Sequence, residues 1–261
     1  MNKILHIALM GILIAGTIVL LAFTEREHKR KTYKSLHAEI LNPSAQSMIN
    51  MEEIYALVEG KFGTIEGSPI TATDLNELEH AVIANPYVSK CEVYQTIEGI
   101  LEMKVVVREP LVRIINQEDE HFYIDYNGYA MPLSPAHPSH VIVANGRIHA
   151  RFISLDKAEK PISLFPDSSF VRQIYPVAWY ISQDEFLSSF IDQIYINENK
   201  EMELVPKIGS QIILFGNADN AKEKLENLRT FYLKAMSHMD WSVYKTINLK
   251  YKNQVVCSKY N

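Results

Sequence analysis

The chain of 261 residues has few cysteines and no surplus of basic residues. Its two cysteines, Cys91 and Cys257, fit neither the spacing of a zinc site nor a disulfide framework, and we interpret both as small buried side chains. The formal net charge is −5, whereas nucleic-acid binding needs a basic face. The composition therefore argues against a zinc site, a disulfide framework and a nucleic-acid partner.

Signatures of common enzyme and nucleotide-binding classes are also missing. The sequence contains no G-x-G-x-x-G, G-x-x-x-x-G-K-S/T, G-x-S-x-G or H-E-x-x-H pattern. His137 and His140 lie on a proline-rich loop without a nearby cysteine or acidic partner, which is typical of solvated histidines. The carboxylates of residues 118–120 indicate a solvated turn. We predict no catalytic residue, no cofactor and no metal, and hence a protein that is not an enzyme.

One long apolar run lies near the N-terminus. In residues 4–23 only His6 and Thr17 are polar, and a helix of this length measures about 30 Å, the thickness of the bilayer core. We predict a cytoplasmic tail at residues 1–3, a transmembrane helix at residues 4–23 and a linker at residues 24–34. A cleaved signal peptide is the alternative, although its apolar core is normally shorter and ends in small residues.

The charges around this run favour the opposite orientation. Five basic residues follow the run within the linker, whereas only Lys3 and the amino terminus precede it. Counted alone, they place the C-terminal side in the cytoplasm, but long domains translocate largely regardless of charge. The orientation therefore needs independent support.

The segment after the linker is organised as strand, helix, helix, strand, strand. A strand is expected at residues 36–41. Asn50 with Glu53 caps a helix that ends at Gly60, and Asp74 caps a second helix that stops before Pro86. We therefore expect two helices between the first strand and the next.

The end of this segment changes to a strand period. Apolar residues alternate along residues 100–108, which places Glu102, Lys104 and Arg108 on a solvent-facing side. The preceding strand, with Cys91 on its core face, pairs with it through a tight turn. This predicts a β-α-α-β-β domain at residues 35–110.

Strands dominate residues 111–261, for which we predict an antiparallel sheet with flanking helices. Hairpins are expected at residues 122–133, with a tight turn at Asn127 and Gly128, and at residues 193–205. A capping box of Ser182 and Glu185 predicts one helix. A further strand at 211–215, a longer helix at 221–235 and a final pair of strands at 243–251 and 254–257 complete the domain. The predicted class is α+β.

Three local patterns carry a resemblance to a known family. Residues 85–110 begin with Asn-Pro-Tyr-Val, continue through two predicted strands and end with Arg-x-Pro. Residues 122–133 begin Phe-Tyr-Ile-Asp and end Pro-Leu. Residues 247–256, Ile-Asn-Leu-Lys-Tyr-Lys-Asn-Gln-Val-Val, are the most specific. In these patterns and in the order of its parts the chain resembles the bacterial cell-division protein family FtsQ/DivIB; its short tail and the Lys259-Tyr260 end depart from the family pattern.

The resemblance implies a single-pass protein of the bacterial inner membrane. The N-terminus would be cytoplasmic, and a POTRA-type domain and a β domain would be periplasmic. It further implies a divisome scaffold that links early and late division proteins. The implied partners are FtsB/FtsL-type proteins at the last strand and FtsK-type or other division proteins at the POTRA domain.

The resemblance also implies partner-binding residues in the final strand pair: Lys250, Tyr251, Gln254, Val255, Val256 and Lys259. An exposed last strand offers unpaired N–H and C=O groups to which a partner can add a strand. Strand alternation leaves a second interpretation open, in which Val255 and either Tyr251 or Val256 face the core.

Two other functions stay open at this point. A POTRA-containing chaperone-like module could assemble outer-membrane or secreted proteins, although such proteins usually carry repeated POTRA units. A membrane-tethered periplasmic enzyme would be favoured by a deep pocket with convergent polar groups.

Overall fold

The computed structural model describes residues 10–11, 13–19, 31–42, 48–134, 138–152, 160–236 and 241–260. Contacts divide the chain into two compact units, Met1–Val107 and Arg108–Asn261. Of the predicted membrane span, only residues 10–11 and 13–19 are described, and they are helical. No helix in the described part of the chain combines the length and apolar character needed to cross a membrane.

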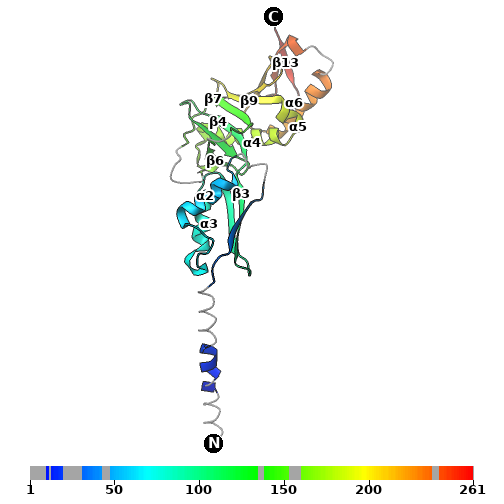
Figure 1. Ribbon diagram of the computed structural model, residues 1–261. Coiled ribbons are helices and arrows are strands. Elements are labelled where there is room, and N and C mark those ends of the chain that lie inside the picture. Colours follow the sequence, from blue (N-terminus) through cyan, green and yellow to red (C-terminus); the bar gives the residue numbers. More distant parts are fainter. Residues whose placement is uncertain are drawn as a thin grey trace. The chain divides into compact units, whose positions relative to one another are not determined.

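In its described residues from 31 onward, the first unit contains a three-stranded sheet and two α-helices (Figure 1). The sheet order is β1-β3-β2, with β1 parallel to β3 and β2 antiparallel to it. The order of elements along the chain confirms the predicted strand-helix-helix-strand-strand succession. Its elements are β1 (Ser35–Ile40), α2 (Met51–Phe62), a 3₁₀ turn (Ile70–Ala72), α3 (Leu75–Ile83), β2 (Val88–Gln95) and β3 (Ile100–Val107).

Local signals explain these elements. Asn50 and Glu53 form the predicted capping box at the start of α2, and the carboxylate of Asp74 accepts the first free N–H groups of α3. Alternate side chains of β3 are buried, as predicted. The prediction that Arg108 faces solvent was wrong, because its side chain is only 2% exposed. Arg108 follows β3 as the first residue of the second unit, and the carboxylate of Asp125 in that unit binds it at 2.8 Å.

The second unit is built on one ten-stranded sheet, in the order β13-β12-β11-β10-β9-β7-β4-β5-β6-β8. Its strands are β4 (Pro110–Ile115), β5 (His121–Asp125), β6 (Tyr129–Pro132), β7 (Ile142–Gly146), β8 (Lys160–Pro161), β9 (Ile191–Ile196), β10 (Met202–Pro206), β11 (Ile212–Gly216), β12 (Tyr244–Asn248) and β13 (Val256–Lys259). The prediction of an antiparallel sheet was wrong in part. The pairs β4–β7, β7–β9 and β11–β12 are parallel. In each pair, the intervening strands or helices bring the chain back to the end of the sheet at which the first strand began, so the second strand runs in the same direction.

In the described part of this unit, three α-helices flank the sheet: α4 (Val171–Ser182), α5 (Glu185–Phe190) and α6 (Ala221–Thr230). A π-helical turn (Phe231–Ala235) extends α6. Short 3₁₀ turns lie at Ile162–Leu164, Asp167–Ser169 and Trp241–Val243. The sequence did not predict α4, which contains Pro176, a residue that normally interrupts helices. Its buried stripe nevertheless packs into the core of the unit. The cap of α5 is Asp184, whose carboxylate accepts the Leu187 N–H at 2.9 Å, and not Ser182 as predicted.

Both predicted hairpins are present. β5 pairs with β6 and β9 pairs with β10, each in antiparallel register. The first turn differs from the prediction, because in it only Gly128 has a positive φ, of 77°. The carboxylate of Asp125 accepts the N–H groups of Asn127 and Tyr129, at 2.9 and 2.7 Å, and so holds this turn.

Candidate partner-binding edge

β13 occupies one end of the ten-stranded sheet and pairs only with β12 among the described strands. Its register joins Ile247 to Cys257 and Asn248 to Val256. β8, at the opposite end, is only two residues long. β13 therefore provides the longer of the two open sheet margins in the described part of this unit.

The backbone of β13 presents alternate residues to this margin. The N–H of Tyr260 donates to the Val243 carbonyl at 3.2 Å, so Tyr260 faces β12. Since consecutive residues of a strand point their N–H and C=O groups to opposite sides, Ser258 also faces β12. Cys257 and Lys259 consequently direct their backbone groups toward the open side.

The side chains on one face of the β12–β13 strand pair pack against the core of the second unit. Ile247 on β12 is fully buried, and Val255 and Cys257 pack partly buried against the same cluster. Burial raises the pKa of the Cys257 thiol. The hydroxyls of Thr246 and Ser258 lie 2.6 Å apart and add a cross-strand hydrogen bond. These contacts hold β13 in place while leaving its outer margin open.

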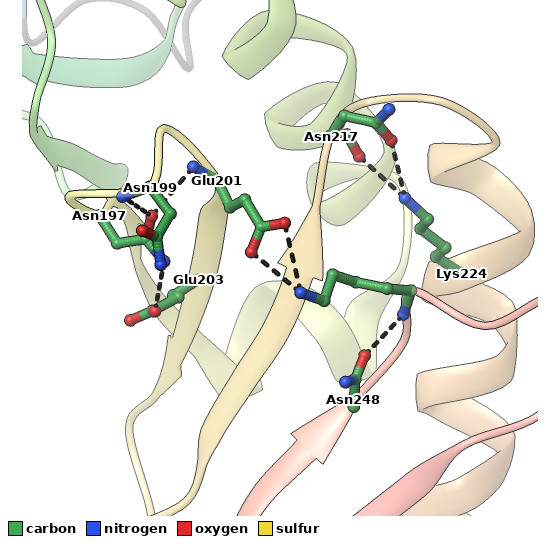
Figure 2. A network of polar contacts seen from close by, with 8 residues as sticks. Asn197, Asn199, Glu201, Glu203, Asn217, Lys224 and Asn248 are labelled. Carbon is green, nitrogen blue, oxygen red and sulfur yellow. Dashed lines mark hydrogen bonds and ion pairs between the residues drawn. The ribbon is translucent and has the colours of Figure 1, made fainter.

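A polar network holds the turn before β13 (Figure 2). Lys250 Nζ lies 3.0 and 3.2 Å from the two carboxylate oxygens of Glu201, and the Lys250 N–H donates to Asn248 Oδ1 at 2.9 Å. Gly216, with φ of 80°, makes room for the stem of Lys250, because an added Cβ would lie 3.0 Å from Lys250 Cγ. The sequence interval between Lys250 and Glu201 is long, so this contact depends on the tertiary fold.

Lys224 is the second cation of this region. Its ammonium group donates to the backbone and side-chain oxygens of Asn217, at 2.9 and 3.2 Å (Figure 2). It also lies 4.9 Å from the centroid of the Phe215 ring. Burial lowers the pKa of Lys224, although the charges of Asp219 and Glu201 oppose this shift. Both lysines therefore make contacts within the second unit, and these contacts hold the segments next to the β12–β13 strand pair.

Comparison with known families agrees with this architecture. The sequence model described as FtsQ/DivIB, C-terminal related, matches residues 109–258. The chain belongs to the FtsQ/DivIB family. A model of the POTRA-like domain matches residues 33–106, within the first unit. No curated protein matches the chain.

The residues that the FtsQ/DivIB resemblance indicated take different positions in this family member. Val256 and Lys259 belong to β13, and Val256 is 42% exposed. Lys250 and Tyr251 lie in the preceding turn, where Tyr251 is exposed and Lys250 is paired with Glu201. Gln254 is exposed outside the strand, and Val255 packs on the core.

The resemblance did not indicate Cys257, whose backbone borders the open margin. The predicted final strand began two residues too early, at residue 254 instead of Val256. With the correct start, strand alternation and the hydrogen bond from the Tyr260 N–H to the Val243 carbonyl together identify Cys257 and Lys259 as the residues whose backbone groups point to the open margin.

The second unit of this FtsQ/DivIB protein also contains a cavity of about 360 Å³ near the first residues of β4, β7 and β9. Ser182 and Ser188 line it, but their hydroxyls donate to the carbonyls of Trp179 and Glu185, within their own helices. Both hydroxyls therefore donate to backbone carbonyls and not to a base that would activate either serine as a nucleophile. No cluster of three metal-ligating residues occurs among the described residues, and predicted loop residue His137 lies outside them.

Proposed function

We propose that this FtsQ/DivIB protein is a non-catalytic scaffold of the division machinery that links early and late division proteins. It binds FtsB/FtsL-type proteins by strand addition along β13. The observation that carries the proposal is the open margin of β13. Membership of a family of division proteins supports the cellular role.

Strand addition accounts for affinity and register together. Main-chain hydrogen bonds attach the partner, and alternate side chains select it. Cys257 and Lys259 offer two N–H and two C=O groups, and each hydrogen bond formed contributes roughly 0.5–1.5 kcal/mol. Val256 and Tyr251 are exposed and supply apolar contact beside this margin. Lys250 can bind a partner only if its ammonium group also keeps, or gives up, its ion pair with Glu201.

The proposal includes the cellular location. Residues 4–23 anchor the chain in the inner membrane with the N-terminus in the cytoplasm, and both units lie in the periplasm. The first unit contacts FtsK-type or other division proteins. The apolar composition of residues 4–23 supports the anchor, and the POTRA-like domain supports a second contact surface.

Co-purification of FtsB and FtsL with variants of the full chain tests the strand-addition mechanism. Deleting residues 254–261 should abolish co-purification while the first unit stays folded. Lys259→Pro is a sharper variant, because it removes an outward N–H without breaking a hydrogen bond to β12. Lys259→Ala is the matched control, since it removes the side chain and keeps the backbone donor.

The proposal expects Lys259→Ala to retain the partners and Lys259→Pro to lose them. If both variants co-purify with FtsB and FtsL as the wild type does, recognition does not use this margin. If both variants lose the partners equally, the lysine side chain and not the strand edge is responsible. Either result rejects strand addition at β13.

A further inference from the structure

A cavity of about 220 Å³ lies between β1 and α2 in the first unit. Leu36, Val58 and Ile65 contribute apolar groups to its lining, and Glu59 and Glu66 contribute carboxylates. Val58 and Ile65 are buried, whereas both glutamates are exposed. Among the residues that the structure describes, no lysine, arginine or histidine lines this cavity. It therefore combines an apolar interior with an acidic rim.

This cavity borders the outer margin of β1, which is the end strand of its sheet. The N–H of Leu41 donates to Val105 on β3 at 2.9 Å. Strand alternation then turns the backbone groups of Leu36, Ala38 and Ile40 away from β3. Just before β1 the margin is closed, because Tyr33 exchanges hydrogen bonds with residues 67–68 at 2.8 and 3.0 Å. Among the described strands, none pairs with the outer side of β1, so the open stretch of the margin is β1 itself.

A side chain from α2 already occupies part of this margin. The outward N–H of Ala38 donates to the Tyr55 hydroxyl at 3.1 Å. Tyr55 also lines the cavity. Its oxygen therefore takes the position that the carbonyl of an added strand would take. An incoming strand has to displace this hydroxyl before it can pair with β1.

The charge of the first unit indicates what kind of segment fits. Residues 31–107 contain five lysines, no arginine and eleven aspartate and glutamate residues, which gives this stretch a charge of −6. The whole chain carries −5, so its negative charge is concentrated here. A long basic side chain can lay its apolar stem along Val58 and Ile65 and reach the carboxylates of Glu59 and Glu66.

We infer that β1 and the adjoining cavity form a second strand-addition site, which takes an extended protein segment carrying a lysine or arginine. The basic side chain enters the cavity, the segment pairs with Leu36 and Ala38, and Tyr55 limits affinity by competing for the Ala38 N–H. This inference rests on the proposed role of the first unit as a contact surface. It is independent of partner binding at β13.

A fluorescently labelled peptide, Thr-Val-Thr-Lys-Thr-Val-Thr, tests the site by fluorescence anisotropy with the full chain. Matched peptides carry leucine or glutamate in place of the lysine. Tyr55→Phe should strengthen binding of the lysine peptide roughly 2- to 10-fold, because the Ala38 N–H no longer has an internal acceptor. Leu36→Pro should abolish binding, because it removes an outward donor and obstructs the margin.

Charge recognition is tested by the double variant Glu59→Gln/Glu66→Gln. It should weaken binding of the lysine peptide roughly 2- to 10-fold at low salt and flatten its salt dependence. The control Glu52→Gln/Glu98→Gln makes the same change of charge outside the cavity and should have little effect.

Three results would overturn the inference. The first is equal affinity for the lysine, leucine and glutamate peptides. The second is binding that Lys259→Pro abolishes and Leu36→Pro does not, which would assign the peptide to β13. The third is self-association of the chain that Leu36→Pro prevents, which would make a second copy the occupant. Loss of FtsB and FtsL in the earlier experiment leaves this test unaffected.

Discussion

Removal of the Asp125 carboxylate tests what holds the β5–β6 hairpin of the second unit. Asp125 is fully buried and accepts hydrogen bonds from Arg108 at 2.8 Å and from the N–H groups of Asn127 and Tyr129. Asp125→Ala removes these contacts and leaves the buried guanidinium without this counter-charge. Breaking one side of a buried ion pair costs roughly 3–5 kcal/mol. We therefore expect the free energy of unfolding of this unit to fall by about 4 kcal/mol.

Urea unfolding followed by tryptophan fluorescence measures this loss. Both tryptophans, Trp179 and Trp241, belong to the second unit, so the signal reports on this unit alone. Asp125→Asn keeps an oxygen for the turn but not the charge, and should cost less than Asp125→Ala. Adding Arg108→Met to Asp125→Ala removes the buried cation and should recover about 2 kcal/mol.

Two outcomes would refute this reasoning. One is a loss below about 1 kcal/mol for Asp125→Ala, the size of an ordinary substitution. The other is a double variant no more stable than the single variant, because the buried charge would then not be the source of the cost.

Two further predictions concern a thiol and two glycines. Burial, with Glu79 and Glu92, raises the pKa of Cys91 to about 12. The folded chain keeps a proton that the unfolded chain loses near pH 9, so stability of the first unit should fall as pH rises from about 9 toward 12. Cys91→Ala should flatten this dependence in hydrogen-exchange measurements on β3; an unchanged slope contradicts it. Gly146 has φ of 95°, and an added Cβ would overlap the Ile196 carbonyl, so Gly146→Ala should cost more than about 2 kcal/mol in urea unfolding. Gly60→Ala, in a helix with open space, should instead stabilise the first unit by about 0.5–1 kcal/mol; equal effects at both glycines would contradict this account.

Short-range patterns predicted much of this fold. The capping box of Asn50, the cap at Asp74 and the alternation along β3 all involve neighbours within a few residues, and the structure contains them. The hairpins β5–β6 and β9–β10 follow from the same local rules. Each of these features depends on backbone hydrogen bonds and side-chain periods that a short segment carries by itself.

Contacts between distant segments account for what the sequence did not predict. Burial of Arg108 requires Asp125, which lies 17 residues further along the chain. The helix α4 tolerates Pro176 because its apolar stripe packs into a core assembled from the whole unit. The parallel strand pairs join segments separated by other elements.

For the candidate partner-binding edge, too, the sequence predicted the local features and the tertiary structure decided the rest. Alternation in the last residues predicted a terminal strand pair, and that part depends on local periodicity. Only the spatial order of the ten strands decided that β13 lies at the end of the sheet. The same arrangement brings Lys250 to Glu201. A strand's own residues set which groups point sideways, but its neighbours in space determine whether those groups are already paired.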